Sequence, residues 1–253
     1  MSARRIAWAV LAVALAAGFA SLGAWQLGRA QWKERQRDAI ARAGTLAPVG
    51  LAAALAAGDA LADANAALAG GTRSDLPPTA PIRVRGSGRF DNAATVLLDN
   101  QVQDGRAGVR VFTLFRPAGA KRSVLVDRGW LALERDQRAA VPPVRGRVEV
   151  QGALALPPAI GIRLGNATFV RGAEPPRLAY LDLPALRAAM GVELFDGVLE
   201  PDPGASYALG PPRSAGSDPM PPERHRGYAV QWFGLAFAVL ATAGWLLWTR
   251  RHD

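Results

Sequence analysis

Residues 6–27 read IAWAVLAVALAAGFASLGAWQL, and this run contains no ionised side chain. Residues 228–249, YAVQWFGLAFAVLATAGWLLWT, form a second uncharged run near the other end of the 253-residue chain. A helix needs about 20 apolar residues to cross a hydrocarbon core of about 30 Å. Tryptophans stand near the ends of both runs, where the indole ring favours the headgroup region. We therefore predict two transmembrane helices, one near each end of the chain.

The first run has a second interpretation, as a cleaved signal peptide. MSARR supplies a positive start, and GFA ending at Ala20 is a candidate cleavage site. A signal peptide has an apolar region of about 7–15 residues. Here the apolar run is longer and continues past Ala20, which favours a retained helix.

Small residues recur at every fourth position in both runs. Such ridges let two membrane helices approach closely, although alanine is abundant enough in this chain to produce the spacing without that role. The two ridges are Ala16, Ala20 and Ala24 in the first run, and Gly234, Ala238 and Thr242 in the second.

Two spans place both termini on one side of the membrane. Arg4 and Arg5, with Arg250 and Arg251, suggest that this side is the cytoplasm, although the inner flanks carry more cations. Loops longer than about 60 residues cross the membrane largely regardless of charge, and the segment between the spans is far longer. We predict a multi-pass protein of the bacterial inner membrane, with a periplasmic central domain and cytoplasmic termini.

The central segment is rich in short Val- and Leu-containing runs separated by Gly, Asn and Pro, a pattern typical of strands. The expected strands are 82–90, 94–100, 109–117, 123–133, 147–156 and 196–201. They predict an antiparallel sheet or partial barrel. The predicted fold class is membrane α+β, with two transmembrane helices flanking one β-rich extracytoplasmic domain that contains a few short helices.

The predicted domain boundaries follow from these patterns. The helical pattern of residues 28–40 continues the first span out of the bilayer. Within the β-rich domain, an alanine-rich helical insert is expected to be exposed, residues 181–194 predict a helix, and a segment dense in Pro and Gly is expected to be a tether. The divisions are an N-terminal transmembrane helix at 1–28, the domain at 29–223 with its insert at 51–70 and tether at 201–222, a C-terminal transmembrane helix at 224–249, and a cytoplasmic tail at 250–253.

The composition excludes several kinds of active site from the central domain. The chain has no cysteine, and its two histidines are His225 and His252, so the domain has neither residue type. A Ser-His-Asp triad and a zinc site with His or Cys ligands are therefore excluded there. The GSG at 86–88 lacks the third glycine of a dinucleotide-binding loop, because Asp91 holds that position. We expect no catalytic residues and no enzymatic activity.

The net charge of +9 does not indicate a nucleic-acid partner. The cations are scattered, and no basic run with interleaved aromatic residues occurs in the middle of the chain. We therefore expect the lipid bilayer and membrane proteins, and not nucleic acid, as partners.

Three motifs carry a resemblance to a known family. They are LGAWQLGRAQWK at 22–33, VLVDRGWLAL at 124–133 and PPERHRGYAVQWF at 221–233. In this order and with a helix at each end, the chain resembles the surfeit locus protein 1 (Shy1-like) family of cytochrome c oxidase assembly factors. The resemblance implies a factor that binds haem a and assists its insertion into the catalytic subunit, which becomes the expected partner together with haem a synthase. The 51–70 insert has no counterpart in the family.

The resemblance also implies roles for particular residues. His225, beside Tyr228 and ahead of Gln231 and Trp232, corresponds to the family's haem-binding histidine. The remaining motif positions also match the family, and two of them, Trp25 and Arg29, are predicted to contact the cofactor. The positions are Trp25, Gln26, Arg29, Trp32 and Lys33 at the end of the first span, and Arg128, Gly129 and Trp130 in the domain.

Helical spacing suggests how such a site would be built. His225, Tyr228 and Trp232 share one helix face, and a neutral imidazole nitrogen can ligate haem iron. Trp25, Arg29 and Trp32 share a face of the first helix, where the Arg29 guanidinium could pair with a propionate. We hypothesise that the two faces meet at the membrane boundary around haem a.

The same residues have other interpretations that stay open. In these, His225 beside arginines is a solvated anchor, the tryptophans are ordinary interface residues, and Arg29 reaches lipid phosphates. Two other functions also fit: a haem-free scaffold that grips nascent oxidase subunits, and a membrane-tethered hydrolase that uses carboxylates with raised pKa values.

Overall fold

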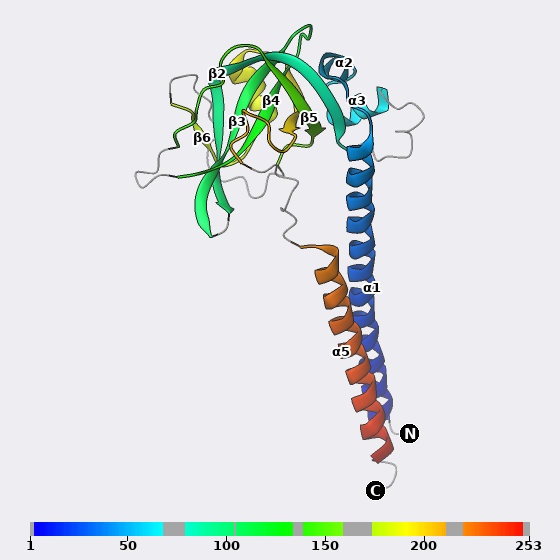
Figure 1. The fold of residues 1–253 in the computed structure, drawn as a ribbon. Coiled ribbons are helices and arrows are strands. Elements are labelled where there is room, and N and C mark those ends of the chain that lie inside the picture. Colours follow the sequence, from blue (N-terminus) through cyan, green and yellow to red (C-terminus); the bar gives the residue numbers. More distant parts are fainter. Residues whose placement is uncertain are drawn as a thin grey trace. The chain divides into compact units, whose positions relative to one another are not determined.

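The computed structural model describes residues 3–67, 79–103, 105–133, 139–158, 174–210 and 220–249. It contains two compact units (Figure 1). The first unit combines Met1–Asp38 with Asp218–Asp253, and the second is Ala39–Ser217. Apolar helices near both ends flank a mixed β-sheet domain, so the predicted fold class is confirmed.

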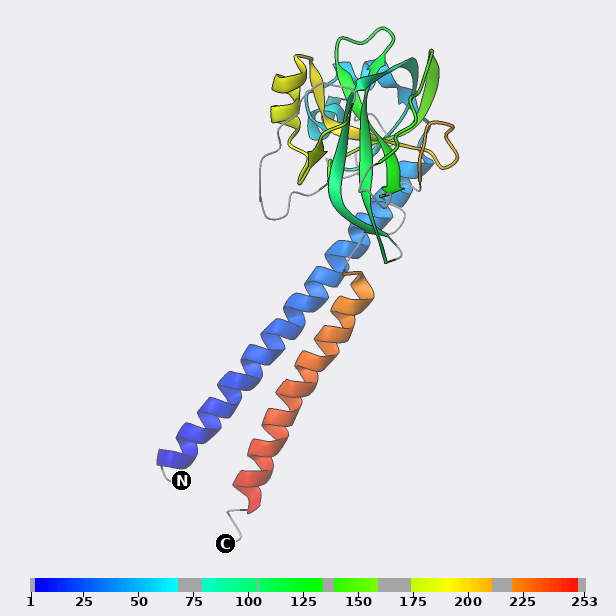
Figure 2. The same ribbon diagram turned by 90° about the vertical axis from the view of Figure 1, so that its left-hand side faces the viewer.

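The first unit is a pair of long helices, α1 (Ala3–Thr45) and α5 (Pro222–Thr249). Both are long and apolar enough to span a bilayer, and Figures 1 and 2 show them side by side. At about 1.5 Å per residue, the 43 residues of α1 are about 64 Å long, roughly twice a hydrocarbon core. The predicted continuation of the first span beyond residue 28 is therefore present and reaches Thr45.

A seam with alternating spacings of three and four residues joins α1 to α5. The positions shielded from solvent include one regular row on each helix: Ala12, Ala16, Phe19, Gly23, Gln26, Ala30 and Lys33 on α1, and Pro222, His225, Ala229, Trp232, Ala236, Val239 and Ala243 on α5. Ala9, Ala20, Glu34, Leu247 and Thr249 are also half-buried. A mean spacing of 3.5 residues is the repeat of a left-handed coiled coil. The two helices therefore pack by this repeat, with a small residue at every seventh position of each helix.

The predicted ridges of small residues are confirmed only in part. Ala16 is buried and Ala20 is half-buried, whereas Ala24, Gly234, Ala238 and Thr242 are exposed, and of these Ala238 and Thr242 line a groove between the helices. A row of residues spaced by four rotates away from the partner helix, because 3.6 residues complete a turn, whereas the alternating row stays on it. Gly23 makes room for an aromatic ring of the partner helix: a Cβ there would lie 2.8 Å from the Phe233 ring.

The second unit is a sheet that closes on itself. Its strands are β1 (Val49–Gly50), β2 (Ile82–Gln103), β3 (Arg106–Pro117), β4 (Ser123–Ala132), β5 (Val148–Ala155), β6 (Arg177–Leu178) and β7 (Leu194–Pro201). The order β2-β3-β4-β7-β5 returns to β2, because β2 also pairs with β5. The long β2 makes this closure possible: residues 82–88 pair with β5 and residues 88–103 pair with β3.

The sheet is mixed, which corrects the antiparallel prediction. The β4–β7 pair is parallel, while the other four pairs of the closed ring are antiparallel. The predicted segments 82–90 and 94–100 are a single strand with a register shift between Asp91 and Thr95. The alternation that breaks at this shift looked like a strand boundary in the sequence.

The core of the barrel contains residues from all five strands of the ring. Ile82 on β2, Phe115 on β3 and Val126 on β4 belong to it, together with Val150 and Phe195 on β5 and β7. Their clustering across the ring identifies this set as the barrel interior.

The alanine-rich insert packs against this core and is not exposed as predicted. It forms α2 (Leu51–Ala56) and α3 (Leu61–Ala67), and its buried residues are Leu51, Ala54, Leu55, Leu61 and Ala64. A Cβ on Gly86 would lie 2.8 Å from Leu51, so this glycine gives α2 room. Small side chains allow such close packing. In the sequence, however, an alanine-rich helix has no polar face that would show which of its sides is buried. Residues 68–70 of the predicted insert lie outside the described residues.

A third short helix, α4 (Leu183–Met190), lies within the predicted 181–194. The Asp182 carboxylate accepts a hydrogen bond from the Ala185 backbone N–H and caps its start. Gly191, with φ 64°, ends it. Leu183, Leu186 and Met190 pack against the outer face of the sheet.

Candidate functional site

The helix pair divides the predicted haem-site residues into two groups. His225, Gln26 and Trp232 lie on the seam between α1 and α5. Tyr228 and Trp25 are exposed, with 45% and 61% of their surfaces accessible. The hypothesis that the Trp25 face of α1 meets the His225 face of α5 is therefore wrong, because the seam uses a different face of α1.

His225 and Gln26 face each other across the seam. The His225 Nδ1 lies 2.6 Å from the Gln26 Oε1, and the two residues are only 5% and 8% exposed. An amide oxygen only accepts hydrogen bonds, so a bond to this oxygen would have Nδ1 as its donor. In that tautomer of a neutral imidazole, the lone pair is on Nε2. This buried position excludes the interpretation of His225 as a solvated anchor.

Trp232 lies seven residues from His225 on the same seam. Its ring stacks on Phe19 of α1, with centroids 5.7 Å apart and planes 24° apart. Seven residues along a helix correspond to about 10 Å. The Phe19–Trp232 pair therefore fills the seam about two turns from the imidazole, where the seam residues are apolar.

The outward face of α1 has a different local arrangement. The Arg29 guanidinium lies 4.2 Å from the centroid of the Trp32 ring, a cation–π geometry. Trp25 is exposed on the same side, and Gln231 is exposed on α5. These positions are accessible to lipid headgroups or to a partner protein, and they are not part of the imidazole's surroundings.

Two ion pairs join the helices on the other side of His225. Arg226 pairs with Glu34, and Arg37 lies 3.2 Å from Glu223. Lys33 is half-buried at the next seam position after Ala30. Solvent-exposed pairs of this kind contribute little to stability, because water and salt screen the charges. The buried hydrogen bond of His225 is therefore flanked by apolar packing on one side and by weak polar contacts on the other.

The motif at Arg128 serves the interior of the second unit. Arg128 is 2% exposed, and its Nε and Nη2 donate to the carbonyls of Tyr207 and Pro142 at 3.0 and 2.8 Å. Burial lowers the pKa of this guanidinium. Arg128 thus joins β4 to two later segments of the chain, and it has no surface to offer a partner.

The next two residues of the motif are also structural. Gly129 has φ 108°, and a Cβ there would lie 2.6 Å from the backbone N of Gly210. Trp130 Nε1 donates to the Gln101 carbonyl at 3.0 Å, and its indole covers Gly108, where a Cβ would come within 2.3 Å. The motif is therefore explained by packing in the barrel.

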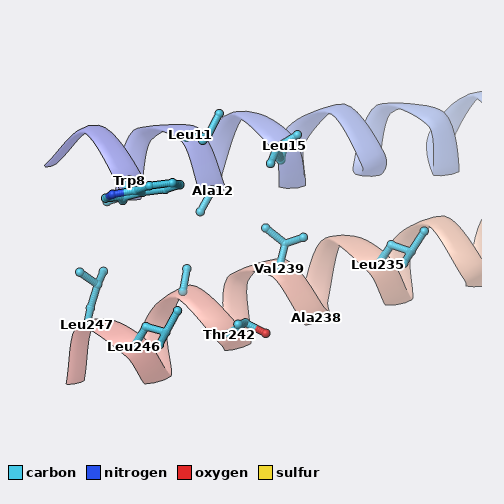
Figure 3. Close-up of a pocket in the computed structure, with 12 residues that line it drawn as sticks. Trp8, Leu11, Ala12, Leu15, Leu235, Ala238, Val239, Thr242, Leu246 and Leu247 are labelled. Atoms are coloured by element: carbon cyan, nitrogen blue, oxygen red, sulfur yellow. The ribbon is translucent and has the colours of Figure 1, made fainter. Parts of the chain in front are cut away.

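An apolar groove lies between the helices, away from His225 (Figure 3). It has a volume of about 580 Å³, and Trp8, Leu15, Leu235 and Leu247 are among its lining residues. The nearest of these on α5, Leu235, is ten residues from His225, which is about 15 Å along the helix. The groove is thus separate from the imidazole.

Asp202 does not have the raised pKa that a carboxylate-dependent hydrolase needs in its general acid. Arg83 donates to both oxygens of Asp202, with Nη2 2.9 Å from Oδ2. The hydrogen bonds from Arg83 outweigh burial and lower the pKa of Asp202. A general acid at neutral pH needs the opposite shift. In the described part of the chain, no group of three or more His, Asp or Glu side chains could hold a metal ion.

Sequence reasoning missed the pairing of Gln26 with His225. Each residue belongs to one of the sequence motifs, but the two motifs are separate, and neither indicates the pairing. The alternating three- and four-residue spacing of Gly23, Gln26 and Ala30 was the available signal, because it places Gln26 among small residues on one face.

Residues 13–237 match the model of the SURF1 family. A comparison with curated proteins found no match. The matched range includes Gln26, Arg128 and His225, and therefore all three motifs.

Proposed function

Because the chain belongs to the SURF1 family of cytochrome oxidase assembly factors, we propose that it binds haem a and assists its insertion into the catalytic subunit of the oxidase. The two helices that can span a membrane agree with such a role. The finer elements of the proposal are the cofactor, its ligand and the transfer step.

The buried His225–Gln26 pair is the observation that supports haem binding. Polar side chains inside membrane helices are costly, and they mark functional sites by default. A histidine that ligates a metal usually donates its other ring N–H to an oxygen, which orients the ring. Gln26 provides such an oxygen at 2.6 Å. The donor chemistry of this pair would therefore suit ligation of haem iron.

Particular residues would hold the cofactor. His225 would supply the Nε2 lone pair, and the iron would accept it. Trp232 and Phe19 provide an apolar aromatic wall on the same seam. Since His225 is only 5% exposed, this end of the helix pair must open before a macrocycle can reach the ring.

The location is part of the same proposal. Arg224 and Arg226 flank His225, so the imidazole would lie near a membrane boundary. We place the β-rich unit in the periplasm and both termini in the cytoplasm of a bacterial inner membrane. Haem a synthase would then be the donor and the oxidase catalytic subunit the acceptor.

An optical measurement tests the ligand. The full-length protein is purified from cells that make haem a, as wild type, His225→Ala and His252→Ala. We expect His225→Ala to lower the haem content by about tenfold or more, because the imidazole that would ligate the iron is lost. His252→Ala, the other histidine, is the matched control. An unchanged Soret band in His225→Ala would remove His225 as the ligand.

A haem-free scaffold is the second candidate, favoured by the closed seam around His225. In that case the buried pair would hold the two helices together, and the protein would grip nascent oxidase subunits directly. Haem stoichiometry separates the two functions. Wild-type protein that recovers the oxidase subunit but contains no haem supports the scaffold.

A further inference from the structure

The hydrogen bond between Gln26 and His225 has a chemical consequence beyond joining two helices. A neutral histidine has two tautomers, with the proton on Nδ1 or on Nε2. The nitrogen without the proton is the one that can donate a lone pair to a metal. The residue that selects the tautomer therefore also selects the ligating nitrogen.

We propose that Gln26 is a positioning residue that holds His225 as the Nδ1–H tautomer, with the Nε2 lone pair available. The proposal rests on the proposed function only for the use of that lone pair. The tautomer itself is a property of this chain without cofactor.

The geometry supports an oriented pair. The 2.6 Å separation of Nδ1 and Oε1 is short for a hydrogen bond, and both side chains are more than nine-tenths buried. Gly23 and Ala30 flank Gln26 on its seam, and Ala229 follows His225 on the other. Around the pair, the neighbouring seam positions are thus small, and they leave the two longer side chains to face each other.

A purely structural seam would not need this pair. Burying an amide and an imidazole costs free energy unless their polar atoms are paired, and small or apolar side chains pack membrane helices without that cost. A polar pair at one point of an otherwise mostly apolar seam fixes the orientation of the imidazole ring. The amide fixes which edge of the ring is bonded and which edge remains for another group.

The tautomer can be read directly by nitrogen NMR. The full-length protein, labelled with ¹⁵N at histidine, contains only His225 and His252, and His252→Ala assigns the two signals. At a pH where the ring is neutral, protonated and bare ring nitrogens give distinct shifts. For His225 we expect a protonated Nδ1 and a bare Nε2. A protonated Nε2 in the wild type would overturn the proposal.

Three substitutions test whether Gln26 is the cause. Gln26→Leu removes the acceptor, and we expect the His225 signal to move toward the Nε2–H tautomer or a mixture. Gln26→Glu retains an acceptor oxygen and should keep the Nδ1–H tautomer, including where Gln26→Leu fails to insert. Gln31→Leu changes an exposed glutamine of the same helix and should leave the spectrum unchanged. An unchanged tautomer in Gln26→Leu would contradict the proposal.

Haem affinity provides a second, separate readout. Loss of an orienting partner typically lowers metal affinity by about 10–100-fold, so we expect that fall for Gln26→Leu and recovery in Gln26→Glu. Wild-type protein with the Nδ1–H tautomer but no haem would refute the proposed function and leave the positioning role intact. If the apoprotein has the proton on Nε2 and the protein still binds haem through His225, the positioning role is refuted and the proposed function stands.

Discussion

At the scale of single residues, the second unit contains a buried tyrosine, Tyr207, whose surroundings disfavour ionisation of its hydroxyl. Tyr207 is buried in the core of the barrel, which we call the interior cluster. In the described part of the chain, its hydroxyl makes no hydrogen bond of normal geometry. Burial raises the pKa of Tyr207 to about 12, and the backbone of Gln151 opposes the shift only in part. Tyr207 is therefore a neutral filler of the core.

The pH dependence of stability follows from the sign of this shift. A raised pKa in the folded state gives stability that is complete below pH 10 and is lost as the pH rises toward 12. At pH 11 the loss from this group is about 1 kcal/mol. Tyr207→Phe should abolish this part of the alkaline loss and leave stability at pH 8 unchanged or slightly higher, because the hydroxyl loses only its weak contact with the Gln151 backbone.

Denaturant titrations of the full-length protein at pH 8 and pH 11 measure this difference. Tyr180→Phe, at a half-buried position outside the interior cluster, is the control. Equal alkaline losses in the wild type and in Tyr207→Phe would show that Tyr207 does not govern this range.

At the scale of elements, the helix seam depends on small residues spaced by seven. Gly23 lies under the Phe233 ring, whereas the space around Gly28 is open. Helix pairs in membranes owe much of their association to such close approach. A large side chain on the seam should therefore separate the helices, and the same side chain on the outer face should not.

Gly23→Leu and Gly28→Leu test this difference. The chain has no cysteine, so nitroxide labels on Val13→Cys and Leu240→Cys, both exposed positions, report alone on the distance between α1 and α5. We expect a longer and broader distance distribution in Gly23→Leu and an unchanged one in Gly28→Leu. Identical distributions in the two variants would show that the seam tolerates a large residue.

The same scale shows what sequence could and could not predict. Long uncharged runs identify the two helices, and Val-rich runs identify the strands, because each pattern belongs to one element. The pairing of Gln26 with His225 belongs to two elements, so the period of a single helix does not contain it. The face of α1 that carries Trp25 looked equally suited to the site, because aromatic residues fit a lipid face as well as a protein interface.

At the scale of the whole molecule, the second unit carries a core of its own. The interior cluster draws on α2, α3 and all five strands of the closed ring, and it includes no residue of Met1–Asp38 or Asp218–Asp253. A domain with its own core folds independently in most cases. The barrel should therefore not require the membrane helices.

Expression of residues 39–217 alone tests this independence. We expect a soluble fragment with a single cooperative thermal transition and a strand-rich circular dichroism spectrum. The same fragment with Phe115→Ala, which empties part of the interior, should melt at a lower temperature, since such truncations cost about 3–5 kcal/mol. A fragment that lacks a cooperative transition would show that the barrel needs the helix pair.

The position of β7 in the sheet determines when the barrel can close during synthesis. This strand lies between β4 and β5, yet among the described strands the ribosome makes it last. Until Leu194–Pro201 emerges, β4 and β5 each keep an unpaired edge, a state prone to wrong pairing. Closure therefore comes when, of the described elements, only α5 remains to be synthesised, and a pause or chaperone at that moment would protect the nascent chain.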